Sequence, residues 1–194
     1  MAIRIIAVPG NPDAVGYVGV PAGGLAKLKG PYGSRGEWGG LPVLTYAGRQ
    51  PLVDGVPVDA KGMKDELAEA IEFAGQRVFG QDWIGHVSTV SGLAHRSVQR
   101  DRIAEHGLPA PVLQLLARAC AHHMPRTLGF AMLSIAYSWR EATEGDDPAE
   151  TAGRMSTSAR DELGHHLKGV VDVALDQVDD IRASIFAFRS STRS

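Results

Sequence analysis

Residues 81–103 read QDWIGHVSTVSGLAHRSVQRDRI, and this stretch decides the expected fold. Asp82 can cap a first helix, because its side chain accepts hydrogen bonds from free backbone N–H groups. Gly92 then interrupts the helical pattern, since glycine adopts the left-handed conformation that ends helices at little cost. A second helix is expected near residues 94–104. The stretch therefore predicts two short helices joined by a tight turn.

The spacing within this stretch is that of a helix-turn-helix. Such a motif needs a small residue where its helices cross, a glycine in the turn, and apolar residues that hold the second helix down. Ser88 lies four residues before Gly92, and Val98 lies six residues after it. Leu93 and Val98 supply the apolar anchors, and Val87 faces them from the first helix.

The side chains left on the outward side or rim of the second helix are polar and mostly cationic. They are His95, Arg96, Gln99, Arg100 and Arg102. Arginine and glutamine have the shape to read guanine and adenine in the major groove of DNA. Three arginines within seven residues also supply contacts to phosphate groups, and we include Arg102 among these. We therefore expect the segment to bind double-stranded DNA.

A family resemblance rests on the residues VSTVSGLAHRSVQRD and on the following GLPAPVLQLLARA. This region, within residues 64–119, resembles the helix-turn-helix of bacterial and phage repressors of the Cro/C1 type. The resemblance implies base-reading roles for His95, Arg96 and Gln99. It also implies phosphate contacts for Gln81 and Arg100. The implied function is that of a sequence-specific DNA-binding transcriptional regulator, and not of an enzyme.

Two positions depart clearly from the pattern of that family, and Ser91, where alanine is usual, departs more mildly. Ala94 stands where a Ser or Thr usually caps the second helix, and the loss of such a cap costs about 1 kcal/mol. Asp101 stands where the residue is often aromatic or apolar. Both departures concern the exact register of the second helix.

Composition divides the chain into three expected regions. Residues 1–62 hold most of the glycine, residues 63–123 hold the helix-turn-helix domain, and residues 124–194 form a C-terminal helical region. Short strands are expected over Ile3–Val8, Pro42–Tyr46 and Val56–Asp59, and the glycine-rich residues 22–40 are expected to form an exposed loop. The expected fold class is mainly α, with a small β-containing N-terminal region and a C-terminal helical bundle or dimerisation region.

The apolar residues of 156–188 recur every three or four positions, which predicts a long amphipathic helix. Its apolar side must pack on something: the apolar helix expected at 127–139, the helical middle of the chain, or a second copy of itself. We expect a homodimer, because helical repressors usually bind paired half-sites on DNA.

Charge and composition limit the remaining possibilities. The net charge is −2, yet residues 81–126 carry five arginines against three acids, which permits a DNA partner. Cys120 is the only cysteine, which excludes an intramolecular disulfide and predicts a buried, inert thiol. No apolar stretch approaches the roughly 20 residues that span a bilayer, so we expect a cytoplasmic protein without a membrane partner. No cofactor is expected.

Two alternatives stay open at this point. The helices of residues 64–122 can form a protein–protein interaction module, or a phage-type adaptor, that does not bind DNA. Glu162 and His165 have the E-x-x-H spacing of di-iron bundles, and paired histidines occur at 122–123 and 165–166, which leaves a His/Glu metal-binding helical protein as a weaker alternative.

Overall fold

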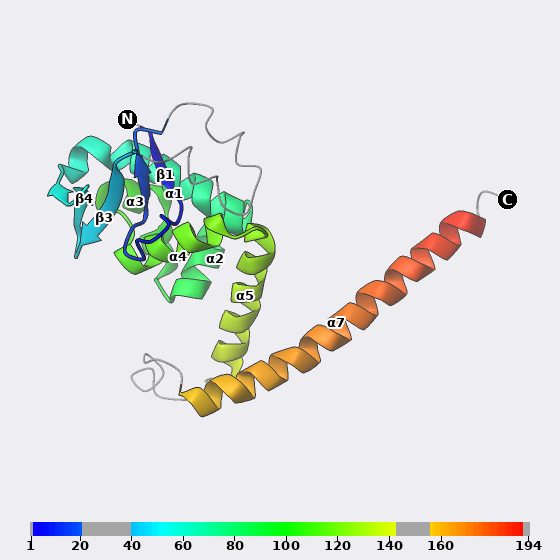
Figure 1. Ribbon diagram of the computed structural model, residues 1–194. Helices are drawn as coiled ribbons and strands as arrows, with labels where there is room; N and C mark the ends of the chain where they lie inside the picture. Colours follow the sequence, from blue (N-terminus) through cyan, green and yellow to red (C-terminus); the bar gives the residue numbers. More distant parts are fainter. Residues whose placement is uncertain (1, 21–39, 143–155, 192–194) are drawn as a thin grey trace. The chain divides into compact units, whose positions relative to one another are not determined.

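The computed structural model describes residues 2–20, 40–142 and 156–191 (Figure 1). The chain divides into two compact units, Met1–Ser134 and Ile135–Ser194. The expected fold class is confirmed, because the chain is mainly helical and begins with a small antiparallel sheet. The glycine-rich loop expected at 22–40 lies almost entirely outside the described residues.

The sheet is a meander in which each strand pairs antiparallel with the next one along the chain. Its strands are β1 (Ile3–Ile5), β2 (Gly16–Val18), β3 (Val43–Ala47), β4 (Gln50–Val53) and β5 (Val56–Pro57). Asp54 and Gly55, both at positive φ, form the turn between β4 and β5. The Asp54 carboxylate also accepts a hydrogen bond from the Val43 N–H at 2.8 Å, which ties the turn to β3. Two of the expected strands are shorter than predicted, and β2 was not predicted.

The helices of the first unit follow the sheet. They are the 3₁₀ turn η1 (Ala60–Met63), α1 (Lys64–Phe79), α2 (Trp83–Ser91), the 3₁₀ turn η2 (His95–Val98), α3 (Arg100–His106), α4 (Ala110–Ala121) and the first part of α5 (Pro125–Ala142). Helix α1 is central and contacts α2, α3, α4 and β1. Ile71, Ala74 and Val78 of α1 are fully buried, because their spacing of three and four residues places them on one side of the helix.

Two glycines let helices approach α1 closely. A Cβ on Gly75 would overlap the Trp83 ring of α2, and a Cβ on Gly129 of α5 would overlap the Val78 carbonyl oxygen. Arg126 of α5 also stabilises the contact between α5 and α1, since its Nη2 donates to the Gln76 carbonyl at 2.8 Å near the end of α1. A cation at this end of a helix also interacts favourably with the partial negative charge of the helix terminus. The start of α5 therefore belongs to the packed part of the first unit.

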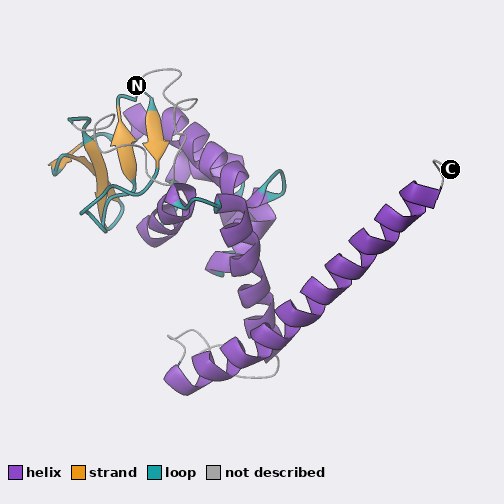
Figure 2. Ribbon diagram, turned by 45° about the vertical axis from the view of Figure 1, so that its right-hand side comes forward, coloured by secondary structure: helices purple, strands orange, loops and turns teal. Residues whose placement is uncertain are grey.

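One hydrophobic core joins the sheet to the helices. Ile5, Val15 and Leu44 from the sheet region lie in the same buried cluster as Ile71 and Leu113 from the helices. The N–H of Ala7 donates to the carbonyl of Ala117 in α4 at 2.9 Å. Figure 2 shows the strands lying against these helices. The described strands of the N-terminal region therefore share one core with the helices of the helix-turn-helix.

The second unit contains the long helix α7 (Thr157–Ser191), which agrees with the helix expected over 156–188. The acidic segment that separates it from α5 in the sequence lies mostly outside the described residues. Over the described residues, no helix is long and apolar enough to cross a membrane.

Candidate nucleic-acid interface

The turn of the helix-turn-helix forms at Gly92. This residue follows α2 with φ 70° and ψ 7°, in the left-handed region where a side chain would be strained. The Ser88 hydroxyl donates to the Leu93 carbonyl at 2.7 Å, and the Ser91 hydroxyl accepts from the Leu93 N–H at 3.3 Å. These two serines satisfy the backbone of the residue after the turn. Ser88 thus acts through a hydrogen bond as well as through its small size.

The apolar anchors of the motif are in place. Val87 of α2 and Val98 of η2 are buried, with exposed fractions of 1% and 0%. Leu93 is partly buried and packs against the same core cluster. The inward side of the segment is therefore fixed by packing, and the direction of its outward side chains follows from that.

The second helix of the motif differs from the prediction. A single helix was expected near 94–104, but the chain forms the 3₁₀ turn η2, an extended residue at Gln99 (φ −67°, ψ 146°), and only then α3. The Ser97 N–H donates to the Ala94 carbonyl in η2, and the Ile103 N–H donates to the Gln99 carbonyl at the start of α3. The chain therefore begins a new helix at Arg100.

The break lies between two buried apolar residues. Val98 and Ile103 are both buried, at 0% and 3% exposure. On one continuous α-helix, residues five apart point about 140° away from each other, so the two side chains would approach the core from widely separated sides of the helix. The extended backbone at Gln99 lets each of them reach the core. Ala94, which makes no side-chain cap, does nothing to favour a helix that starts at His95.

All the expected DNA-contacting side chains are exposed. His95 and Arg96 lie on η2, Gln99 lies at the break, Arg100 and Arg102 lie in α3, and Gln81 precedes α2. The first five come from one short run of chain that the anchors hold in place. Gln81 is set apart from them, at the opposite end of α2.

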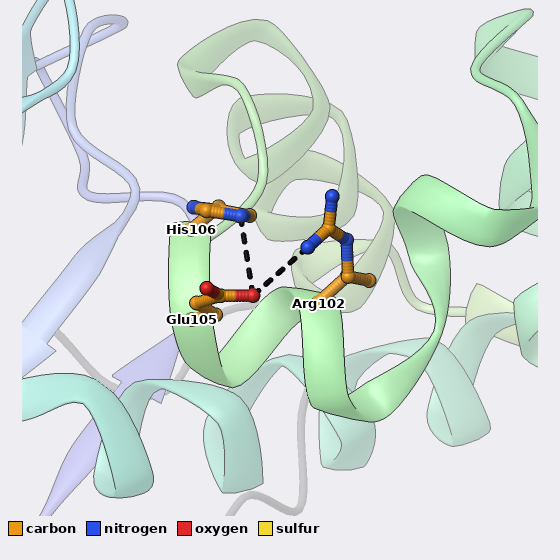
Figure 3. A network of polar contacts seen from close by, with 3 residues as sticks. All are labelled: Arg102, Glu105 and His106. Carbon is orange, nitrogen blue, oxygen red and sulfur yellow. Dashed lines mark hydrogen bonds and ion pairs between the residues drawn. The ribbon is translucent and has the colours of Figure 1, made fainter.

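Carboxylates neutralise two of the three arginines. Arg100 Nη2 lies 3.2 Å from Glu72 Oε2 of α1. Arg102 Nη1 lies 2.9 Å from Glu105 Oε2, and His106 Nε2 lies 3.2 Å from the same oxygen, as Figure 3 shows. These are surface ion pairs, which contribute about 0–1 kcal/mol each and exchange readily for other partners.

Arg96 differs from the other two arginines. Across residues 2–20, 40–142 and 156–191 it makes no ion pair and no hydrogen bond, and its side chain is exposed. Its guanidinium is thus the one in this segment whose charge and donors are available without displacing a carboxylate.

Sequence reasoning missed Glu72, Glu105 and His106. The pair of Arg102 and Glu105 has the three-residue spacing of neighbours on a helix, which could have shown it. The pair of Arg100 and Glu72 joins residues 28 positions apart in the sequence, and no local pattern indicates it.

The histidines of the metal-binding alternative form no site over the part of the chain that is described, where no group of three His, Cys, Asp or Glu side chains is placed to hold an ion. The rings of His122 and His123 lie 4.2 Å apart, and His122 Nδ1 accepts a hydrogen bond from the Met124 N–H. This hydrogen bond stabilises the turn between α4 and α5.

Comparison with known proteins returned no matching family model, no matching curated protein and no matching solved structure. The resemblance to repressors of the Cro/C1 type stays a prediction.

Proposed function

We propose that the η2–α3 segment binds double-stranded DNA and that the protein is a cytoplasmic, sequence-specific transcriptional regulator. The observation that carries the proposal is Arg96: an exposed arginine without an acidic partner over the described residues, two residues before a buried anchor at Val98. Gln99 follows directly after that anchor. Arg96, whose side chain can read guanine, and Gln99, whose side chain can read adenine, therefore lie on either side of the buried Val98.

Each outward residue has a task in this proposal. Arg96 and Gln99 read base edges, and His95 lies beside them. Arg100 and Arg102 exchange Glu72 and Glu105 for phosphate oxygens, which costs little because surface ion pairs are weak. The break at Gln99 means that the reading element is a 3₁₀ turn followed by a short helix, and not one continuous helix.

The test begins with selection of bound duplexes from a pool of random sequences. Binding of the selected duplex and of a scrambled duplex is then measured at one fixed salt concentration, since affinities at different salt concentrations are not comparable. Arg96→Ala should lower the preference for the selected duplex by about 1–3 kcal/mol, the worth of one bidentate contact. Arg96→Lys should lose the preference as well, because lysine keeps the charge but not the planar fork.

Two further variants separate specific from general contacts. Arg100→Ala should weaken both duplexes alike and reduce the salt slope by about one unit. Arg49→Ala, which removes the same charge from the exposed turn between β3 and β4, serves as the matched control and should change neither property. Equal affinity of the wild-type protein for selected and scrambled duplexes contradicts the proposal and favours the protein–protein alternative.

A further inference from the structure

Helix α7 carries a row of exposed apolar side chains. Val170, Val171, Leu175, Val178 and Ile181 are between 43% and 59% exposed. Aliphatic side chains scattered singly on a surface are ordinary, but a continuous row along one helix marks an interaction surface. The row therefore needs a partner.

Three of these residues, Val171, Val178 and Ile181, belong to a seven-residue repeat that runs from 164 to 188. Position a of the repeat holds Gly164, Val171, Val178 and Ile185, and position d holds Leu167, Ala174, Ile181 and Phe188. A repeat with apolar residues at a and d is the pattern of helices that wind around one another. No charged residue occupies either position.

The charges of α7 are arranged around this seam. The acids Asp172, Asp176, Asp179 and Asp180 occupy positions b, f, b and c, on the side away from it. Lys168 and Arg182 occupy position e, at the edge of the seam, where their aliphatic stems can cover apolar residues. The helix is thus divided into an apolar side that can be buried and an acidic side that stays in water.

We propose that α7 pairs with α7 of a second copy of this chain as a parallel, two-stranded coiled coil along residues 164–188. A second copy fits because the seam is self-complementary: its apolar residues meet identical residues in register, and its acids face outward in both copies. β-branched residues at position a combined with leucine at position d favour two-stranded parallel pairing, and Leu167 with Val171 and Val178 follows this pattern.

The side positions favour the parallel orientation over the antiparallel one. In a parallel pair, position e of one helix faces position g of the other, so Leu175 contacts Val170 of the second copy and both exposed side chains are covered. In an antiparallel pair that overlaps the whole seam, position e faces position e, which places Lys168 opposite Arg182. Like charges at this position are unfavourable.

The first test compares two valines of α7 that differ only in their place relative to the seam. Val171 at position a is 53% exposed, and Val173 at position c is 57% exposed. Sedimentation equilibrium of the full chain, without DNA, should give twice the 20.6 kDa chain mass. Val171→Asp should raise the dissociation constant at least about 100-fold, since it places a carboxylate in the seam, and Val173→Asp should leave the mass unchanged.

The second test fixes the orientation. Gly164 lies at position a and Gly169 at position f, and an added Cβ at either one meets nothing within 4 Å, so both accept cysteine. Under mild oxidation, Gly164→Cys should form a disulfide-linked dimer at least about tenfold faster than Gly169→Cys, because only a parallel seam brings the two copies of residue 164 together. The wild-type chain, whose only cysteine is the buried Cys120, is the background control.

Several results overturn the proposal. A wild-type mass of one chain or of three or more, equal effects of Val171→Asp and Val173→Asp, or equal cross-linking from residues 164 and 169 each contradict it. The proposal does not rest on DNA binding, and its tests contain no DNA. Loss of the dimer and loss of operator preference can therefore be told apart.

Discussion

Helices α4 and α7 are both amphipathic, yet they meet opposite surroundings. In α4, Leu113 and Leu116 have no exposed surface, because α1 lies against them in the same unit. In α7, Val178 and Ile181 remain 43% and 58% exposed. A three-to-four periodicity thus indicates which side of a helix is to be buried, but it does not say what buries it. The side chains of α4 are buried within their own unit, whereas we propose that those of α7 are covered by a second copy of the chain.

The largest expected effect on stability comes from truncating a leucine side chain in α4. Leu113→Ala should lower the free energy of unfolding of the first unit by about 2–5 kcal/mol, because a cavity replaces fully buried methyl groups. Ile181→Ala in α7 should leave that free energy unchanged and only weaken association. Urea titrations at two protein concentrations, followed by tryptophan fluorescence, measure both. Similar losses from the two substitutions would mean that α7 belongs to the core of the first unit.

A pair of glycines, one packed in the first unit and one exposed on α7, should show a smaller difference in stability. A Cβ on Gly129 would overlap the Val78 carbonyl oxygen and lie 2.9 Å from Val78 Cγ1, so Gly129→Ala should destabilise the first unit by about 1–3 kcal/mol. Gly169→Ala in α7 meets nothing within 4 Å and should stabilise its helix by up to about 1 kcal/mol. Thermal denaturation followed by circular dichroism gives the sign of each change. Stabilisation by Gly129→Ala would contradict the close packing of α5 on α1.

The parts of the fold that were predictable have local signals. Gly92 needs only its own left-handed conformation, and the helix that became α7 shows its period over more than 30 residues. Strand β2 has three residues, too few to show the alternation that marks a strand. Its place beside β1 depends on Gly16, where a Cβ would overlap the Arg4 carbonyl oxygen, a contact between separate segments.

In the candidate interface, too, the features with local sequence signals were predictable. The turn and the anchor Val98 follow from spacing, and so does the exposure of Arg96. The break at Gln99 does not, because no local pattern marks the extended conformation of that residue. No sequence pattern predicted that Arg100 pairs with Glu72 of α1, since this contact depends on how two helices pack.

An effect confined to alkaline pH concerns Cys120, which was predicted to be buried and is buried in the structure. Burial raises the pKa of its thiol to about 12 from 9.0, although Arg77 and Arg4 nearby act in the opposite direction. Below pH 9 the thiol is neutral in both the folded and the unfolded chain, so it adds no pH dependence. Above that pH the unfolded chain releases the proton and the folded chain keeps it, so stability falls by about 1.4 kcal/mol per pH unit.

Two measurements check the raised pKa and the burial of the Cys120 thiol. The decline in unfolding free energy between pH 9 and pH 11 should be steeper for the wild-type chain than for Cys120→Ala, because the two proteins differ only in this side chain. At pH 8 an alkylating reagent should modify Cys120 far more slowly than the cysteine of Gly169→Cys, because residue 169 is exposed whereas Cys120 is buried with a raised thiol pKa. Equal slopes, or equal rates of alkylation, would show that the thiol is not held in the core between α4 and α1.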